Sequence, residues 1–68
     1  MTGLQENKLN EIVTVECYNK TEKQTRREAL QFYFEGMQCS EGSEHERYET
    51  IFFQLMEGKM FASDKLSY

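Results

Sequence analysis

The chain has 68 residues, of which 38% are hydrophobic and 29% are charged, and its formal net charge is −4. This length allows one small domain, and no stretch reaches the ~20 apolar residues that a membrane span needs. The acidic balance disfavours direct binding to DNA or RNA, although the pair Arg26 and Arg27 forms a small basic spot. Because no basic segment followed by an apolar one opens the chain, we expect a cytoplasmic protein.

The first ten residues, MTGLQENKLN, show no hydrophobic period and contain few apolar side chains. They are typical of a flexible N-terminal segment. Periodic patterns begin at residue 11, so we expect a single small domain over residues 11–64 and a short tail over residues 65–68.

The stretch EIVTVECY alternates between apolar and polar positions. Val13, Val15 and Cys17 fall on one side of an extended chain, which indicates a half-buried strand. Asn19 tolerates a positive φ, so we expect a tight turn into a short polar strand over residues 21–24. Together these segments predict a β-hairpin with one exposed edge.

A helix is predicted directly after the hairpin. Thr25 is a suitable N-cap, and Glu28 stands three residues later, as in a capping box. The apolar stripe of this helix follows the i, i+3, i+4, i+7 rule and consists of Leu30, Tyr33, Phe34 and Met37. Gly36 interrupts the stripe at a cost of roughly 1 kcal/mol relative to Ala, and one interpretation is close packing of a neighbour.

The stretch CSEGSEHERYETI, residues 39–51, holds a thiol, an imidazole and four carboxylates. Within it Ser43 and Glu46 form a second S-x-x-E pattern, which predicts a capping box and a helix that begins at Ser43. The apolar stripe of this helix consists of Tyr48, Ile51, Phe52, Leu55 and Met56. Gly58 stands where a left-handed C-cap is expected.

The C-terminal segment contains a short apolar pair, Met60 and Phe61, which either adds a third strand or covers the core. Two amphipathic helices must bury their stripes, and the inner face of the hairpin is the available partner. The sequence therefore predicts an α+β fold, in which an N-terminal β-hairpin packs against two antiparallel helices (ββαα).

Cys17, Cys39 and His45 are the candidates for metal or thiol chemistry. A zinc site formed by all three is geometrically conceivable, but the paired spacings of structural zinc sites are missing. A disulfide between the two cysteines is the other alternative, and without a leader we favour reduced thiols. A Cys39–His45 pair lacks an orienting third group, and no catalytic motif occurs, so we expect no catalytic, metal or cofactor site.

Two surfaces are candidates for binding. Tyr18, Phe32 and Phe53 fall off the apolar stripes, and exposed aromatic side chains often mark the site of a protein partner or of self-association. The second surface consists of four glutamates, Glu41, Glu44, Glu46 and Glu49. Its simpler interpretation is a solvated helix start that keeps the protein soluble, and its functional one is a carboxylate patch for a basic partner.

Residues 28–64 resemble a group of short proteins of Firmicutes, often carried in conjugative transposons and related mobile elements. The likeness is carried by Glu28-Ala29, Phe32-Tyr33, Cys39-Ser40-Glu41-Gly42-Ser43-Glu44, Arg47-Tyr48, Leu55, Gly58 and Ser63-Asp64. No established activity comes with this resemblance. It implies an intracellular, accessory role in a Gram-positive bacterium.

These observations predict a small non-enzymatic module for protein–protein interaction, with a homodimer as one form of it. The alternative is an acidic inhibitor that occupies the nucleic-acid groove of a defence enzyme. Its motivation is that residues 35–68 carry seven acids and three bases. A net charge of −4 is small for a nucleic-acid mimic, which disfavours this alternative.

Overall fold

The computed structural model describes residues 6–65 of the chain. Its elements are α1 (Glu6–Leu9), β1 (Ile12–Cys17), β2 (Lys20–Thr25), α2 (Arg26–Gln38), α3 (Gly42–Met56) and β3 (Phe61–Ser63). The predicted α+β fold is therefore confirmed, and the C-terminal segment adds a third strand. None of the helices in the described range is long and apolar enough to cross a membrane.

Residues 1–5 and 66–68 lie outside the described residues. Most of the predicted C-terminal tail and half of the predicted N-terminal segment therefore cannot be compared with the structure. Within the predicted N-terminal segment, Glu6–Leu9 forms the single turn α1, which no sequence pattern indicated. The backbone carbonyl of Lys8 in this turn accepts a hydrogen bond from Arg26 of α2. The turn α1 is thus tied to the start of α2 by a hydrogen bond.

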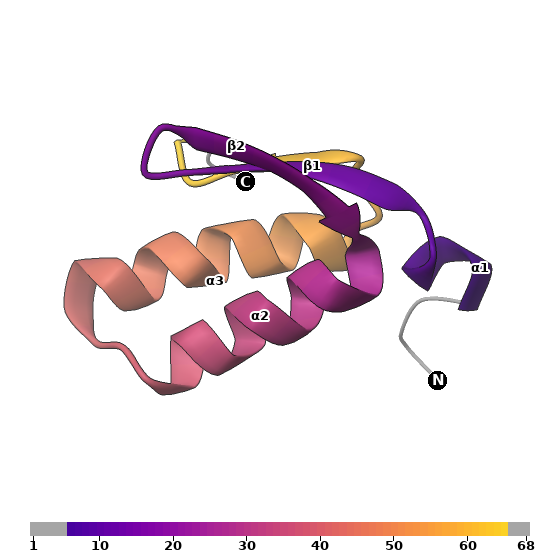
Figure 1. The fold of residues 1–68 in the computed structure, drawn as a ribbon. Coiled ribbons are helices and arrows are strands. Elements are labelled where there is room, and N and C mark those ends of the chain that lie inside the picture. The colour runs from indigo at the N-terminus through magenta and orange to yellow at the C-terminus, as the bar shows by residue number, and fades with distance from the viewer. Residues whose placement is uncertain (1–5, 66–68) are drawn as a thin grey trace.

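The three strands form one sheet in the order β2-β1-β3, with β1 antiparallel to β2 and parallel to β3. Both long helices lie on the same face of this sheet and run side by side (Figure 1). The core fills the space between the sheet and the helices, and it consists of Val13, Val15, Ala29, Tyr33, Ile51, Leu55 and Ala62. Within residues 6–65, no helix covers the opposite face of the sheet (Figure 1).

The hairpin turns through Tyr18 and Asn19, which have φ angles of 55° and 65°. Two left-handed residues between paired strands are the geometry of a tight primed turn. The sequence predicted Asn19 in this role. A bulky residue such as Tyr18 rarely adopts a positive φ, and its backbone N–H is held here by Oδ2 of Asp64 at 3.0 Å.

The two helices begin in different ways. The predicted capping box of α2 is present: Thr25 Oγ1 accepts from the N–H of Glu28, and the Glu28 side chain accepts from the N–H of Thr25. The predicted box at Ser43 is wrong, because α3 begins at Gly42 and no side chain caps it. Gly42 makes the turn into the helix with a φ of 65°, which places Ser43 inside the first turn instead of before it.

Gly36 allows α2 and α3 to approach closely. A Cβ atom at this position would lie 3.0 Å from the ring of Tyr48 on α3. The Tyr48 ring in turn packs against Tyr33, with the ring centroids 5.7 Å apart. The interpretation of Gly36 as room for a neighbour is therefore correct.

Arg26 is the largest fully buried side chain and lies at the start of α2. Its guanidinium donates hydrogen bonds to the backbone carbonyls of Lys8, Leu55, Gly58 and Lys59. It also pairs with Oε1 of Glu11 at 2.9 Å. One side chain thus joins α1, the end of α3 and the loop that leads to β3.

Both edges of the sheet are protected against pairing with another strand. On β2, the positions that face the helices hold Lys20, Glu22 and Gln24, and inward-pointing charges on an edge strand oppose further pairing. On β3, the buried Gln54 of α3 donates to the carbonyl of Ser63 at 2.9 Å and accepts from its N–H at 3.1 Å. The Gln54 amide therefore takes the place of a neighbouring strand.

Candidate functional site

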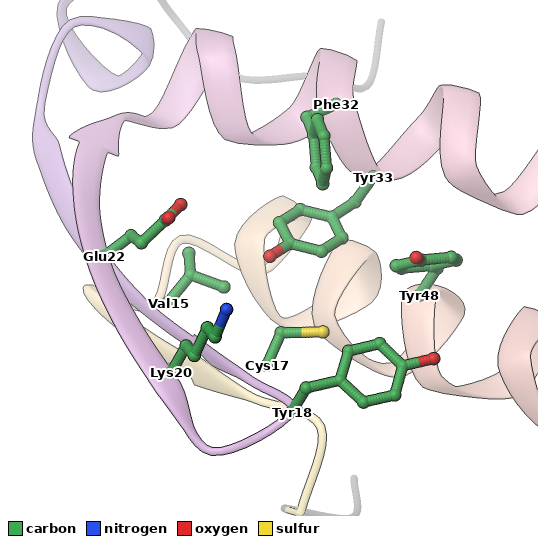
Figure 2. Close-up of a pocket in the computed structure, with 8 residues that line it drawn as sticks. All are labelled: Val15, Cys17, Tyr18, Lys20, Glu22, Phe32, Tyr33 and Tyr48. Carbon is green, nitrogen blue, oxygen red and sulfur yellow. The ribbon is translucent and has the colours of Figure 1, made fainter.

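An aromatic pocket lies between the hairpin and α2. Its volume is about 160 Å³, and four aromatic side chains form its walls (Figure 2): Tyr18, Phe32, Tyr33 and Tyr48. Val15 and Cys17 of β1 form the floor, and Lys20 and Glu22 of β2 stand at the mouth. We call this site the aromatic pocket.

The inner groups of the aromatic pocket are uncharged at neutral pH. Burial raises the pKa of the Cys17 thiol, and the negative charge of Asp64 raises it further. Burial and the neighbouring Cys17 thiol raise the pKa of Tyr33, and burial raises that of Tyr48. A nucleophilic cysteine requires the opposite shift, toward a thiolate.

A polar network holds the hairpin turn next to the aromatic pocket. Arg47 of α3 forms an ion pair with Asp64, and its guanidinium carbon lies 4.1 Å from the ring centroid of Tyr18. The Tyr18 hydroxyl donates to Oε2 of Glu44 at 2.8 Å, and this hydrogen bond raises the pKa of Tyr18. The turn is thus tied to the start of α3 and to the residue after β3.

Asp64 is the centre of this network, and its side chain is 0% exposed. Burial raises the pKa of its carboxyl group, but the hydrogen bonds from Tyr18 N–H and from Arg47 outweigh burial and lower the pKa overall. Within the described residues, Oδ1 of Asp64 and Nε of Arg47 have no hydrogen-bond partner. The network is therefore incompletely satisfied.

An apolar patch covers the side of the helix pair that faces away from the sheet. We call it the helical patch, and it consists of Phe34, Phe52, Phe53 and Met56. The Phe52 ring lies 5.8 Å from Phe34 and 5.9 Å from Phe53, so that α2 and α3 both contribute to one surface. Phe34, Phe53 and Met56 are all exposed. Each helix therefore carries more apolar side chains than the core buries.

The uncovered face of the sheet carries a smaller apolar group. It consists of Ile12 and Phe61, which are both exposed, whereas the sulfur of the exposed Met60 accepts from the Arg26 guanidinium. Phe61 pairs with Thr14 of β1, whose own cross-strand partner on β2 is Lys23. Polar side chains therefore interrupt this face.

The three predicted aromatic surface residues are all exposed, but they do not form one site. Tyr18 and Phe32 both line the aromatic pocket, and Phe32 is 58% exposed. Phe53 belongs to the helical patch on another side of the molecule.

The four predicted glutamates are not gathered into one patch. Glu44 binds the Tyr18 hydroxyl, whereas Glu46 lines a polar hollow beside Arg47 and Asp64. Residues two positions apart on a helix point to different sides, so Glu44 and Glu46 cannot share a face. Glu41 precedes α3, and Glu49 is partly buried on it.

Cys17, Cys39 and His45 are placed on separate elements. Cys17 faces the aromatic pocket, Cys39 is exposed at the end of α2, and both thiols are free. Nδ1 of His45 lies 2.9 Å from the carbonyl oxygen of Met37. Over residues 6–65, no three His, Cys, Asp or Glu side chains are arranged to hold a metal ion.

Arg47, Gln54 and Asp64 are three residues whose contacts the sequence analysis did not predict. Arg47 pairs with Asp64 across 17 positions, and Gln54 binds the backbone of Ser63 nine positions away. No local period links such partners. The available signal was that Asp64 is the single aspartate of the chain and follows directly on a short apolar segment.

Comparison with known proteins found no match to this chain. No family model, no curated protein and no solved structure matches this chain.

Proposed function

We propose that this protein is a non-enzymatic interaction module, and that its helical patch binds a second copy of the same chain. The observation that carries the proposal is the helical patch, in which Phe52 contacts both Phe34 and Phe53 and in which Phe34, Phe53 and Met56 are exposed. Exposed aromatic and Met side chains are enriched where proteins associate.

A second copy fits the helical patch because each chain offers a layer of two antiparallel helices. Two such layers with apolar outer faces pack as a four-helix bundle. An interface related by a two-fold axis uses the same patch on both chains, so it requires no feature beyond those present in one copy. Dimerisation by strand pairing is disfavoured, because inward charges protect β2 and Gln54 covers β3.

The surface area of the chain is compatible with this arrangement. A standard interface covers about 800 Å² on each partner, or about one sixth of the 4645 Å² surface of this chain. A dimer therefore needs most of one face.

The chemistry of the aromatic pocket supports a non-catalytic role. The pKa of Cys17 is raised by burial, and His45 interacts with a backbone carbonyl instead of the thiol. The resemblance to short proteins of bacterial mobile elements gives such a module an accessory role there. The acidic-inhibitor alternative is not favoured by any observation, since Glu44 binds the Tyr18 hydroxyl and Glu46 lines a hollow beside Arg47.

The mass of the protein in solution tests this proposal. We expect sedimentation equilibrium to give a dimer of about 16.2 kDa, twice the chain mass of 8.1 kDa. Phe53→Glu and Phe34→Glu place a charge in the helical patch and should each give the monomer.

The matched control is Phe32→Glu, which makes the same change at an exposed position of α2 outside the helical patch. It should remain dimeric. Circular dichroism establishes that all variants keep their helices. A wild type that sediments at 8.1 kDa over the whole accessible concentration range contradicts the proposal, as does a Phe32→Glu variant that dissociates like Phe53→Glu.

A further inference from the structure

The aromatic pocket exists because β2 does not contribute to the core. Its helix-facing residues are hydrophilic: Lys20 stands opposite Cys17, and Glu22 stands opposite Val15. These side chains remain at the mouth and leave a hollow among the aromatic side chains (Figure 2). An apolar hollow with a charged rim is typical of a ligand site and unusual for a packed core.

The size of the aromatic pocket selects one six-membered ring. A cavity of about 150 Å³ lined by apolar side chains accommodates benzene, and the aromatic pocket has about 160 Å³. Phe32 and Tyr33 already meet edge to face, with centroids 4.9 Å apart. A ring that enters beside them gains further edge or offset contacts with Tyr33 and Tyr48.

The charges around the aromatic pocket exclude a cationic ligand. Arg47 already occupies one face of the Tyr18 ring, and Lys20 brings a second positive charge to the mouth. Glu22 balances Lys20, so the rim as a whole is neutral. The inner tyrosines are uncharged, since burial raises the pKa of both Tyr33 and Tyr48.

We propose that the aromatic pocket binds a single uncharged aromatic ring of phenol or toluene size, between Phe32 of α2, the Tyr48 ring and the Cys17 floor. Such a ring belongs either to a free small aromatic molecule or to a Phe or Tyr side chain of a peptide. This inference does not rest on self-association, because the pocket and the helical patch lie on different sides of the molecule.

The two thiols provide a test with an internal reference. Cys17 lies on the pocket floor, whereas Cys39 is exposed at the end of α2. Alkylation by iodoacetamide, followed for each cysteine by mass spectrometry, is carried out with increasing p-cresol. We expect p-cresol to slow alkylation of Cys17 in a saturable manner and to leave Cys39 unchanged.

Variants of the pocket wall make the test specific. Phe32→Ala removes one exposed wall and should weaken the protection of Cys17 by roughly tenfold. Phe61→Ala removes a similarly exposed ring from the uncovered sheet face and should have no effect. Amide shifts in NMR spectra provide a second readout, with changes expected at Cys17 and Tyr48 and none at Phe53.

The source of the ring is distinguished by a second probe, the peptide Gly-Tyr-Gly. If the peptide protects Cys17 at lower concentration than p-cresol, the ring belongs to a peptide. If p-cresol protects Cys17 at lower concentration than the peptide, the ligand is a free aromatic molecule. The proposal is overturned if neither probe slows Cys17, if Cys17 and Cys39 slow equally, or if Phe61→Ala weakens protection as much as Phe32→Ala.

Discussion

The two ends of the helix pair are each fastened by an arginine, but in different ways. At the end where α2 begins, Arg26 is 0% exposed and its guanidinium binds four carbonyls and the Glu11 carboxylate. At the hairpin end, the Arg47 side chain is 34% exposed, and it pairs with Asp64 and covers the Tyr18 ring.

The two arginines therefore differ in how tightly each one fixes the structure around it. A buried arginine whose donors are all used fixes one geometry, because every displacement breaks several hydrogen bonds. The Arg47–Asp64 pair leaves Nε and Oδ1 unpartnered, and it borders the aromatic pocket through Tyr18. We therefore expect the Arg26 end to determine stability and the hairpin end to tolerate change.

The largest effect is expected from Arg26→Met. This substitution removes the donor that the carbonyls of Gly58 and Lys59 share, and each buried acceptor left without a partner costs ~1–3 kcal/mol. The Leu55 carbonyl keeps its hydrogen bond from the N–H of Gly58. A total loss of about 3–5 kcal/mol is comparable with the whole stability of a domain of this size. Urea unfolding followed by circular dichroism should show a largely unfolded protein.

The neighbouring Arg27→Met is the matched control for this prediction. Arg27 is exposed, so the free energy of unfolding should change by about 0.5 kcal/mol at most, at concentrations where the chain is monomeric. Equal unfolding midpoints for the two variants would remove the distinction between the two ends.

The second prediction concerns acid and the hairpin end. The folded pKa of Asp64 lies below its usual value of 3.8, so its ionised form stabilises the fold. This contribution is complete above the unfolded pKa and is lost as the pH falls through the lower folded pKa. The unfolding free energies of wild type and Asp64→Asn should therefore converge below about pH 4.

A constant gap between wild type and Asp64→Asn from neutral pH to pH 3 (roughly the acid limit of such titrations) would contradict the role of Asp64.

The third prediction compares the starts of the two helices. Thr25→Ala removes a formed capping box and should lower the free energy of unfolding by about 1 kcal/mol. Ser43→Ala should have an effect within about 0.5 kcal/mol, because α3 begins at Gly42 without a side-chain cap. Thermal unfolding of both variants measures this difference. Equal losses of unfolding free energy would indicate that Ser43 caps α3 as the sequence predicted.

The smallest net effect is expected from Gly36→Ala. Alanine gains about 1 kcal/mol in helix propensity, but its Cβ would lie 3.0 Å from the Tyr48 ring. The two contributions should nearly cancel. In a Tyr48→Ser background the ring is absent, and the same substitution should then stabilise the protein by about 1 kcal/mol; no gain in that background would show that the ring is not the obstacle.

Local chemistry accounts for the parts of this molecule that the sequence predicted. The alternation of Val13 and Val15, the capping box at Thr25 and the 3.6-residue stripes all depend on neighbours within a few positions. The exposure of Phe32 and Phe53 followed from the same periodicity, because both fall off the stripes.

The features that the sequence did not predict depend mostly on contacts between residues that are far apart in the chain. Arg26 belongs to an Arg-Arg pair that resembles a basic surface spot, and its burial depends on carbonyls 29 to 33 positions away. The box at Ser43 failed because the N-cap of α3 is Glu41, two positions before the predicted cap. The aromatic pocket depends on the register of β2, which places Lys20 and Glu22 toward the helices.

The amide of Gln54 has a consequence for how this chain behaves when many copies are present. By bonding both the N–H and the carbonyl of Ser63, it occupies the site where an incoming peptide would dock. A carboxylate at the same position accepts but does not donate, so the carbonyl would become available to another molecule. A single side chain on a helix therefore closes this part of the β3 edge to strand pairing.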